Sequence, residues 1–131
     1  MTTFRLPTMC AATLSMIFAI SCGDGNESDR VGIASECKVD ADCSRVGDFQ
    51  LTCLTMFKGG YCGLAGCVQD VDCPLGAACV LEGGANYCFR ECLDKPECNA
   101  NRTPDNEANC VGSITHVGAS TSKVCVPPSG T

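Results

Sequence analysis

Cysteine is the residue through which this chain could do most chemistry, since a thiol can form a disulfide, bind a metal or carry a lipid. The 131 residues include fourteen cysteines, and twelve of them follow residue 36 in three sets of four: Cys37, Cys43, Cys53, Cys62; Cys67, Cys73, Cys79, Cys88; Cys92, Cys98, Cys110, Cys125. Cysteine metal sites use close pairs such as Cys-x-x-Cys, whereas the tightest spacing here, Cys88 to Cys92, leaves three residues between. The spacing therefore predicts disulfides in an oxidising compartment, with no metal and no cofactor.

Paired aspartates are the second candidate for chemistry. Asp40 and Asp42 precede Cys43, and Asp70 and Asp72 precede Cys73, each pair in the pattern Asp-x-Asp-Cys. Alternating carboxylates could bind Ca²⁺, but such a site needs six or more oxygens and only two can be named in each set. The favoured interpretation is an Asx turn, in which the carboxylates accept hydrogen bonds from nearby backbone N–H groups.

Neither catalysis nor nucleic-acid binding is indicated. The single histidine, His116, has no nucleophile or acid beside it in a recognisable motif, and we expect an exposed hairpin residue there. No phosphate-binding loop or nucleophile elbow occurs, so we expect no enzyme activity. Acids outnumber cations, with a formal net charge of −6, and we expect no nucleic-acid binding because phosphate contacts require clustered cations.

The N-terminal segment has the pattern of an export signal. Residues 1–21 carry one cation, Arg5, then an apolar core from Cys10 to Ile20 that is too short to span a bilayer. The sequence Ala-Ile-Ser before Cys22 suits an ordinary signal peptidase and also resembles a bacterial lipobox, although the family usually has Leu where Ala19 stands. A lipid on Cys22 would leave an even number of cysteines, so we expect lipidation there. Residues 22–36 then form the lipidated Cys and a flexible acidic tether.

A repeated unit positions the twelve later cysteines. Five residues separate the first two cysteines of every set, whereas the later gaps vary, which predicts a rigid turn followed by loops of tolerant length. Short apolar runs around glycine-rich turns predict one hairpin in each unit, with arms at 54–57 and 61–62, 80–81 and 87–89, and 111–117 and 122–126. The boundaries are repeat 1 at 37–66, repeat 2 at 67–91, repeat 3 at 92–126 and a C-terminal tail at 127–131.

The fold class expected is small and disulfide-rich, mostly loops with short β-hairpins, in three tandem four-cysteine modules. Aromatic residues are few and Trp is absent, so disulfides are expected to supply stability that a thin core cannot. The polar stretch 99–109 between two cysteines is open to two interpretations, a recognition loop or a tolerated insertion.

The string from Cys67 through Asp70, Asp72 and Cys73-Pro74 to Cys79 resembles the cysteine-rich repeat of exported bacterial lipoproteins. It is also similar to the cysteine-rich modules of Dickkopf N-terminal regions and to the EB module. The resemblance covers about residues 37–126 and implies a non-catalytic, extracellular module. Analogy with such small modules favours pairing of the first cysteine with the third and the second with the fourth.

Together these features predict an exported, lipid-anchored protein with a binding or structural role at the cell envelope. Its partners would be the membrane, through the lipid, and an extracellular or periplasmic protein or glycan, with no nucleic acid. Outer-membrane or cell-surface placement is expected. The alternative is a soluble secreted protein, such as a protease inhibitor that presents a disulfide-framed loop.

Overall fold

The computed structural model describes residues 32–130. The predicted signal at 1–21 and Cys22 lie outside the described residues. The helices and strands are η1 (Asp40–Asp42), β1 (Arg45–Val46), β2 (Phe49–Gln50), β3 (Thr52–Cys53), β4 (Cys62–Ala65), η2 (Asp70–Asp72), β5 (Ala77–Glu82), β6 (Ala85–Cys92), α2 (Lys95–Cys98), η3 (Pro104–Asn106), β7 (Asn109–Val111), β8 (Thr115–His116) and β9 (Lys123–Val126). The predicted fold class is confirmed: six disulfides link short strands and loops in three tandem four-cysteine units.

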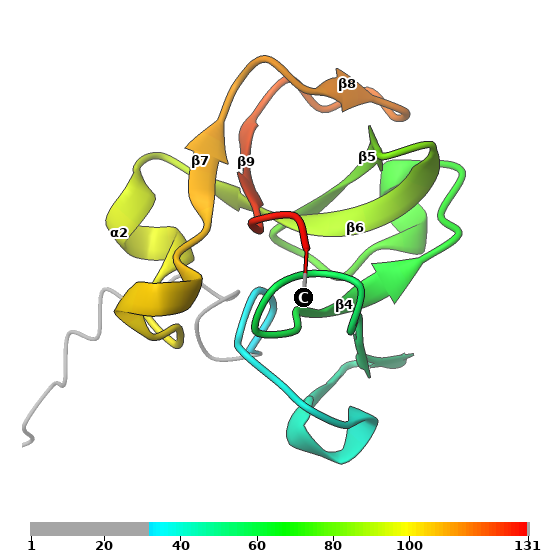
Figure 1. Cartoon of the computed structure of the whole chain (residues 1–131). Coiled ribbons are helices and arrows are strands. Elements are labelled where there is room, and N and C mark those ends of the chain that lie inside the picture. Colours follow the sequence, from blue (N-terminus) through cyan, green and yellow to red (C-terminus); the bar gives the residue numbers. More distant parts are fainter. Residues whose placement is uncertain (1–31, 131) are drawn as a thin grey trace, which may run out of the picture.

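Strand β6 is the element that all three units share. It pairs antiparallel with β5 of its own unit, with β4 of the first unit and with β9 of the third (Figure 1). The three disulfide units therefore build one continuous sheet, and the second unit occupies its centre.

The second-unit hairpin forms as predicted. Glu82 lies opposite Ala85, so Gly83 and Gly84 make a two-residue turn with φ of 58° and 86°. Positive φ at both central positions is the type I′ geometry that matches strand twist, and glycine adopts it without a steric penalty. Cys79 and Cys88 lie directly opposite each other on the two arms.

The first-unit hairpin exists in a different place from the one predicted. Its arms are β3 and β4, with Cys53 opposite Cys62, and the predicted arms at 54–57 and 61–62 lie mostly in the connection. That connection is folded by two turns, in which Phe57 N donates to Leu54 O and Gly60 N donates to Phe57 O. Both Leu54 and Phe57 are buried, so burial of these side chains, and not strand pairing, decides the local conformation.

The third-unit hairpin is also shorter than predicted. Strand β7 pairs with β9 and sets Cys110 opposite Cys125, but residues 112–122 leave the hairpin. They cross to the second unit, where β8 covers the open edge of β5 with His116 opposite Val80. An uncovered edge would expose unpaired backbone groups, which explains why the predicted arm is diverted.

Four aromatic side chains form the centre of the core. Phe57, Tyr61, Tyr87 and Phe89 pack with ring centroids 5.0–6.2 Å apart. Tyr61 is fully buried, and its hydroxyl donates to Cys125 O at 3.1 Å and accepts from Arg90 N at 3.0 Å. The cluster thus joins the first two units and is hydrogen-bonded to the third.

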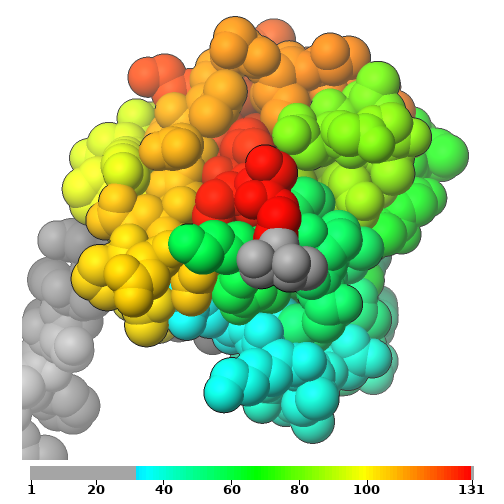
Figure 2. Space-filling model, viewed as in Figure 1, coloured from blue at the N-terminus to red at the C-terminus, as the bar shows by residue number. Residues whose placement is uncertain are grey.

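Both ends of the described chain dock on the first unit. At the C-terminal end, Lys58 N donates to Pro128 O, and Phe57 forms a β-bridge with Ser129. The red C-terminal segment in Figure 2 lies against the green surface of the first unit. The tail is therefore docked on the first unit as far as Ser129.

Residues 32–36 correct the predicted extent of the tether. Ile33 and Ala34 are each only 2% exposed, and Ala34 N donates to Cys62 O while Glu36 N donates to Asn101 O. These residues belong to the folded body because an aliphatic side chain and several backbone groups find partners there. The remainder of the predicted tether, 22–31, lies outside the described residues.

Candidate functional site

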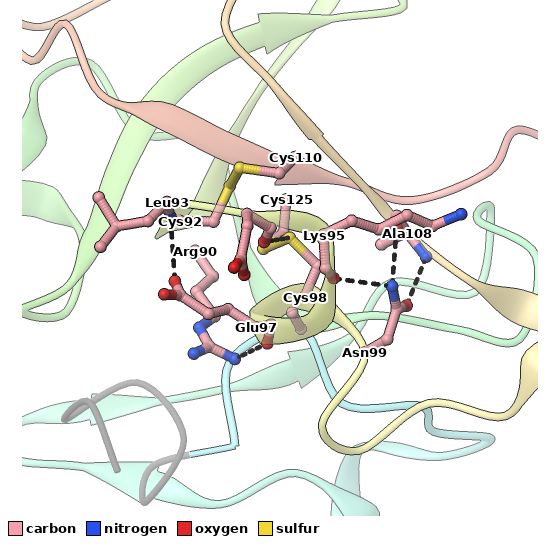
Figure 3. Close-up of a disulfide and its surroundings, with 12 residues drawn as sticks. Arg90, Cys92, Leu93, Lys95, Glu97, Cys98, Asn99, Ala108, Cys110 and Cys125 are labelled. Atoms are coloured by element: carbon pink, nitrogen blue, oxygen red, sulfur yellow. Dashed lines mark hydrogen bonds between the residues drawn. A yellow bond between two sulfur atoms is a disulfide. The ribbon is translucent and has the colours of Figure 1, made fainter. Parts of the chain in front are cut away.

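The disulfides follow one connectivity in every unit, first cysteine to third and second to fourth. The bridges are Cys37–Cys53, Cys43–Cys62, Cys67–Cys79, Cys73–Cys88, Cys92–Cys110 and Cys98–Cys125. The third and fourth cysteines face each other across the hairpin, and each reaches back to one end of the five-residue turn. This is the pairing that analogy with small modules favours, and Figure 3 shows both bridges of the third unit.

The second acid of each turn closes that turn by accepting backbone hydrogen bonds. Asp42 Oδ2 accepts from Lys38 N at 2.8 Å and from Val39 N at 3.2 Å. Asp72 Oδ2 accepts from Val68 N at 2.9 Å and Gln69 N at 3.1 Å. In the third unit Glu97 takes this role and accepts from Leu93 N at 3.0 Å (Figure 3).

The first acid of the pair ties the turn to the hairpin. Asp40 Oδ1 accepts from Cys53 N at 2.8 Å, and Asp70 Oδ1 accepts from Cys79 N at 3.0 Å. The third unit has Lys95 at this position, and a different residue closes its loop: Asn99 bonds the backbone of Lys95 and Ala108 (Figure 3).

Backbone N–H groups point at these carboxylate oxygens, so a Ca²⁺ ion there would meet the positive end of each amide dipole. Hydrogen bonds from Lys38 N and Val39 N lower the pKa of Asp42. The hydrogen bond from Cys79 N likewise lowers the pKa of Asp70, and it outweighs the desolvation that acts to raise it. The expected bonding of these carboxylates to backbone N–H groups is therefore present, but the turn is not an Asx turn: Asp42 and Asp72 reach back three and four residues, as a capping acid does at the start of a helix. Among residues 32–130, the close groups of three metal-type ligands consist of cysteines engaged in disulfides.

Arg102 anchors the third unit to the first. This side chain, 9% exposed, comes from the polar loop 99–109. Its Nη1 donates to Ala34 O at 3.0 Å and Gly60 O at 2.9 Å. Nη2 donates to Lys58 O at 2.9 Å, and the guanidinium lies 5.9 Å from the Tyr61 ring centroid.

Thr103 adds a second contact to the same interface. Its N and Oγ1 donate to Glu36 Oε1 at 2.8 Å and 2.7 Å. Burial acts to raise the pKa of Glu36, but these two hydrogen bonds and nearby Arg102 leave it below its usual value. Neither interpretation of residues 99–109 anticipates this arrangement, because the loop is used to join units within the chain.

A second loop of the third unit, residues 112–122, anchors it to the second unit. Ser120 N donates to Asp70 Oδ2 at 2.9 Å, and Ser120 Oγ donates to Glu91 Oε1 at 2.8 Å. Gly118 lies so close that a Cβ there would be 2.3 Å from Asp70 Cγ. The extra length of the third unit's gaps is therefore used to hold the other two units.

His116 is placed differently from the exposed hairpin position expected. It is half-buried on β8, and neither ring nitrogen has a hydrogen-bond partner within the described part of the chain. The correction follows from the diverted loop, which lays β8 against β5 instead of along β9.

An open hollow of about 430 Å³ lies beside η2 in the second unit. Val71 and Leu75 line it with 73% and 80% of their surfaces exposed, and Pro74 and Ala77, which also line it, are buried. Asp70 and Glu91, the two acids that Ser120 bridges, also line it. Sequence reasoning missed this hollow, although the aliphatic residues on either side of Cys73 were its visible signal.

No helix of residues 32–130 has the length and apolar character needed to cross a membrane. Comparison with known proteins finds no matching family model, no matching curated protein and no matching solved structure. The resemblance to Dickkopf-type and EB-like repeats therefore stays a prediction.

Proposed function

We propose that this protein is exported, anchored by a lipid on Cys22, and acts at the cell envelope by binding, without catalysis. The observation that carries the proposal is that the six bridges use every cysteine after residue 36. Only Cys10 and Cys22 precede them, and Cys10 falls within the predicted signal. After signal removal, Cys22 would have no partner in its own chain, which is the situation that thioether lipidation resolves.

Disulfide content supports the export step. Six bridges in one small body are typical of proteins that mature outside the cytoplasm, where thiols are not kept reduced. Removal of Arg5 with the signal would leave eight cations and fifteen acids, a net charge of −7. Such a surface is repelled by anionic lipid, so membrane attachment would depend on the lipid chain.

A binding role is supported by the turns. Their carboxylates are engaged by backbone N–H groups, so these acids hold shape. Each turn is also fixed at both ends by disulfides, and in the second unit it presents Val71 largely to solvent. A side chain presented by a rigid turn loses little entropy on binding, which favours its use in recognition.

Metabolic labelling with palmitate tests the anchor. The full chain and its Cys22→Ser and Cys10→Ser variants would be expressed in a bacterial host that processes lipoproteins. Label is expected in the wild type and in Cys10→Ser, the matched control, and absent from Cys22→Ser, which should fractionate as a soluble protein. An unlabelled wild type, or a Cys22→Ser variant that stays with membranes, would refute the anchor and favour the soluble secreted alternative.

A further inference from the structure

The hollow beside η2 combines exposed aliphatic side chains with a built floor. Val71 and Leu75 are 73% and 80% exposed, whereas two other lining residues are buried: Pro74 fully and Ala77 with 8% of its surface exposed. Large aliphatic side chains at such exposure contribute little to folding, since they remain in water in the folded state. Other aliphatic side chains, such as Leu93 and Val68, are as exposed, but Val71 and Leu75 differ from these in lining one hollow together.

The repeat itself shows that the turn does not require these two side chains. Val71 stands two positions before the second cysteine of its unit, where the first unit has Ala41 and the third has Pro96. Leu75 stands two positions after that cysteine, where the first unit has Arg45 and the third has Ala100. All three turns keep five residues between their first two cysteines and the same disulfide connectivity. The aliphatic pair therefore belongs to the second unit alone and is separable from the scaffold.

Two carboxylates border the same hollow. Ser120 donates to both, through N to Asp70 Oδ2 and through Oγ to Glu91 Oε1. Within residues 32–130 neither acid is in an ion pair with Lys or Arg. The hollow thus offers aliphatic surface next to negative charge that lacks a strong cation.

We propose that this hollow binds a short segment of a partner protein in which an aliphatic side chain lies next to a Lys or Arg. The aliphatic group would pack between Val71 and Leu75, and the cation would lie near Glu91, because both oxygens of Asp70 already accept from backbone N–H groups. A second copy of this chain would bring the same acids together, and an anionic membrane would be repelled, so charge complementarity favours a cationic peptide. The inference rests on the proposed binding function and specifies its partner.

The test uses the full chain, purified after export to an oxidising compartment. The probe is the peptide acetyl-Ser-Leu-Lys-Leu-Arg-Ser-amide, titrated while backbone amide shifts are followed by NMR. Control peptides replace both cations by Glu, or both Leu residues by Ser. Shifts are expected at Val71, Leu75, Ala77 and Glu91 with the first peptide, weakening as salt is raised.

Variants taken from the repeat sharpen the test. Val71→Ala with Leu75→Arg installs the side chains of the first unit, so the fold should survive while affinity falls at least about tenfold. Glu91→Gln keeps an acceptor for Ser120 and should reduce the salt dependence. Val39→Ala with Met56→Arg alters aliphatic residues that are 56% and 50% exposed in the first unit, and should bind as the wild type does.

Several outcomes would overturn the inference. These are equal binding of the acidic peptide, shifts confined to other surfaces, or no shifts at millimolar peptide. The Cys22→Ser protein would also be tested for self-association and for binding to zwitterionic vesicles. Self-association that Leu75→Arg abolishes would assign the hollow to a second copy, and vesicle binding that Leu75→Arg abolishes would assign it to lipid. Palmitate labelling reports the anchor independently, so a labelled protein that ignores the peptide refutes this inference and leaves the proposed anchor in place.

Discussion

Replacing Arg102 by Ala should be among the most destabilising single changes outside the cysteines. The guanidinium donates to Ala34 O, Gly60 O and Lys58 O from a site that is 9% exposed. Ala34 and Gly60 are buried, so removal of the side chain would leave carbonyl groups with little access to water. These three oxygens belong to chain segments before and within the first unit. The Arg102 side chain is therefore what joins the third unit to these segments at this point.

The magnitude follows from the hydrogen bonds lost. Each bond to a charged donor contributes about 1.5–3 kcal/mol, and the losses are not additive because water can enter the vacated space. We expect a loss of about 3 kcal/mol in the free energy of unfolding, which for a body of this size lowers Tm by about 12–24 °C. Arg102→Lys keeps the charge but cannot donate in several fixed directions, so it should lie between wild type and Ala.

Thermal and urea unfolding of the oxidised protein, followed by circular dichroism, measures this loss. Arg45→Ala is the matched control, because Arg45 is exposed and donates to Gly47 O at 3.2 Å only locally. Hydrogen exchange at Ala34 and Glu36 should accelerate in Arg102→Ala and stay unchanged in Arg45→Ala. Equal Tm values for the two Ala variants would refute the reasoning and show that the Arg102 hydrogen bonds add little to the stability of the folded body.

Three further perturbations test other parts of the account. Acid should destabilise the protein, because folding lowers the pKa of Glu36 below its ordinary 4.5 and the pKa values of Asp42 and Asp70 below their ordinary 3.8. Their contribution to the free energy of unfolding is complete above these ordinary values and is lost as the pH falls through the lower folded-state values. A Tm that does not fall between pH 5 and pH 2 would contradict this. Asp70→Asn turns an amide N–H₂ toward backbone N–H donors, so exchange at Ser120 should quicken about tenfold or more; unchanged exchange would show that the loop is held elsewhere. Calcium at millimolar concentration should leave Tm unchanged, since backbone N–H groups already occupy the carboxylates; a clear rise would restore the metal interpretation.

The sequence was sufficient to predict those parts of the fold that depend on local spacing. Five residues between Cys67 and Cys73 define a turn, and Gly83-Gly84 between apolar arms defines a hairpin, so both features follow from neighbouring residues. The Asp-x-Asp pattern likewise indicated carboxylates that accept from backbone N–H groups, although Asp42 reaches back three and four residues instead of forming the Asx turn expected.

Contacts between units were beyond sequence reasoning. Little in the local sequence marks Arg102 as buried, since three of its four carbonyl acceptors lie 42–68 residues away in the chain and only Asn106 O is near. The diversion of residues 112–122 to β5 depends on an open strand edge in another unit, which the third unit's own sequence does not reveal. Asp70 and Glu91 are brought to the same hollow by Ser120, which donates to both. Ser120 lies 50 residues from Asp70 and 29 residues from Glu91 in the chain.

The central claim is that covalent sulfur bridges, formed outside the cytoplasm, fix the shape of each of the three short units. Peptide mass spectrometry of the native-host protein, digested without reduction after alkylation of free thiols, tests it most directly. The account predicts no alkylated cysteine after residue 36 and the six bridges Cys37–Cys53, Cys43–Cys62, Cys67–Cys79, Cys73–Cys88, Cys92–Cys110 and Cys98–Cys125. Alkylation at most of these twelve positions, or bridges that cross between units, would contradict it.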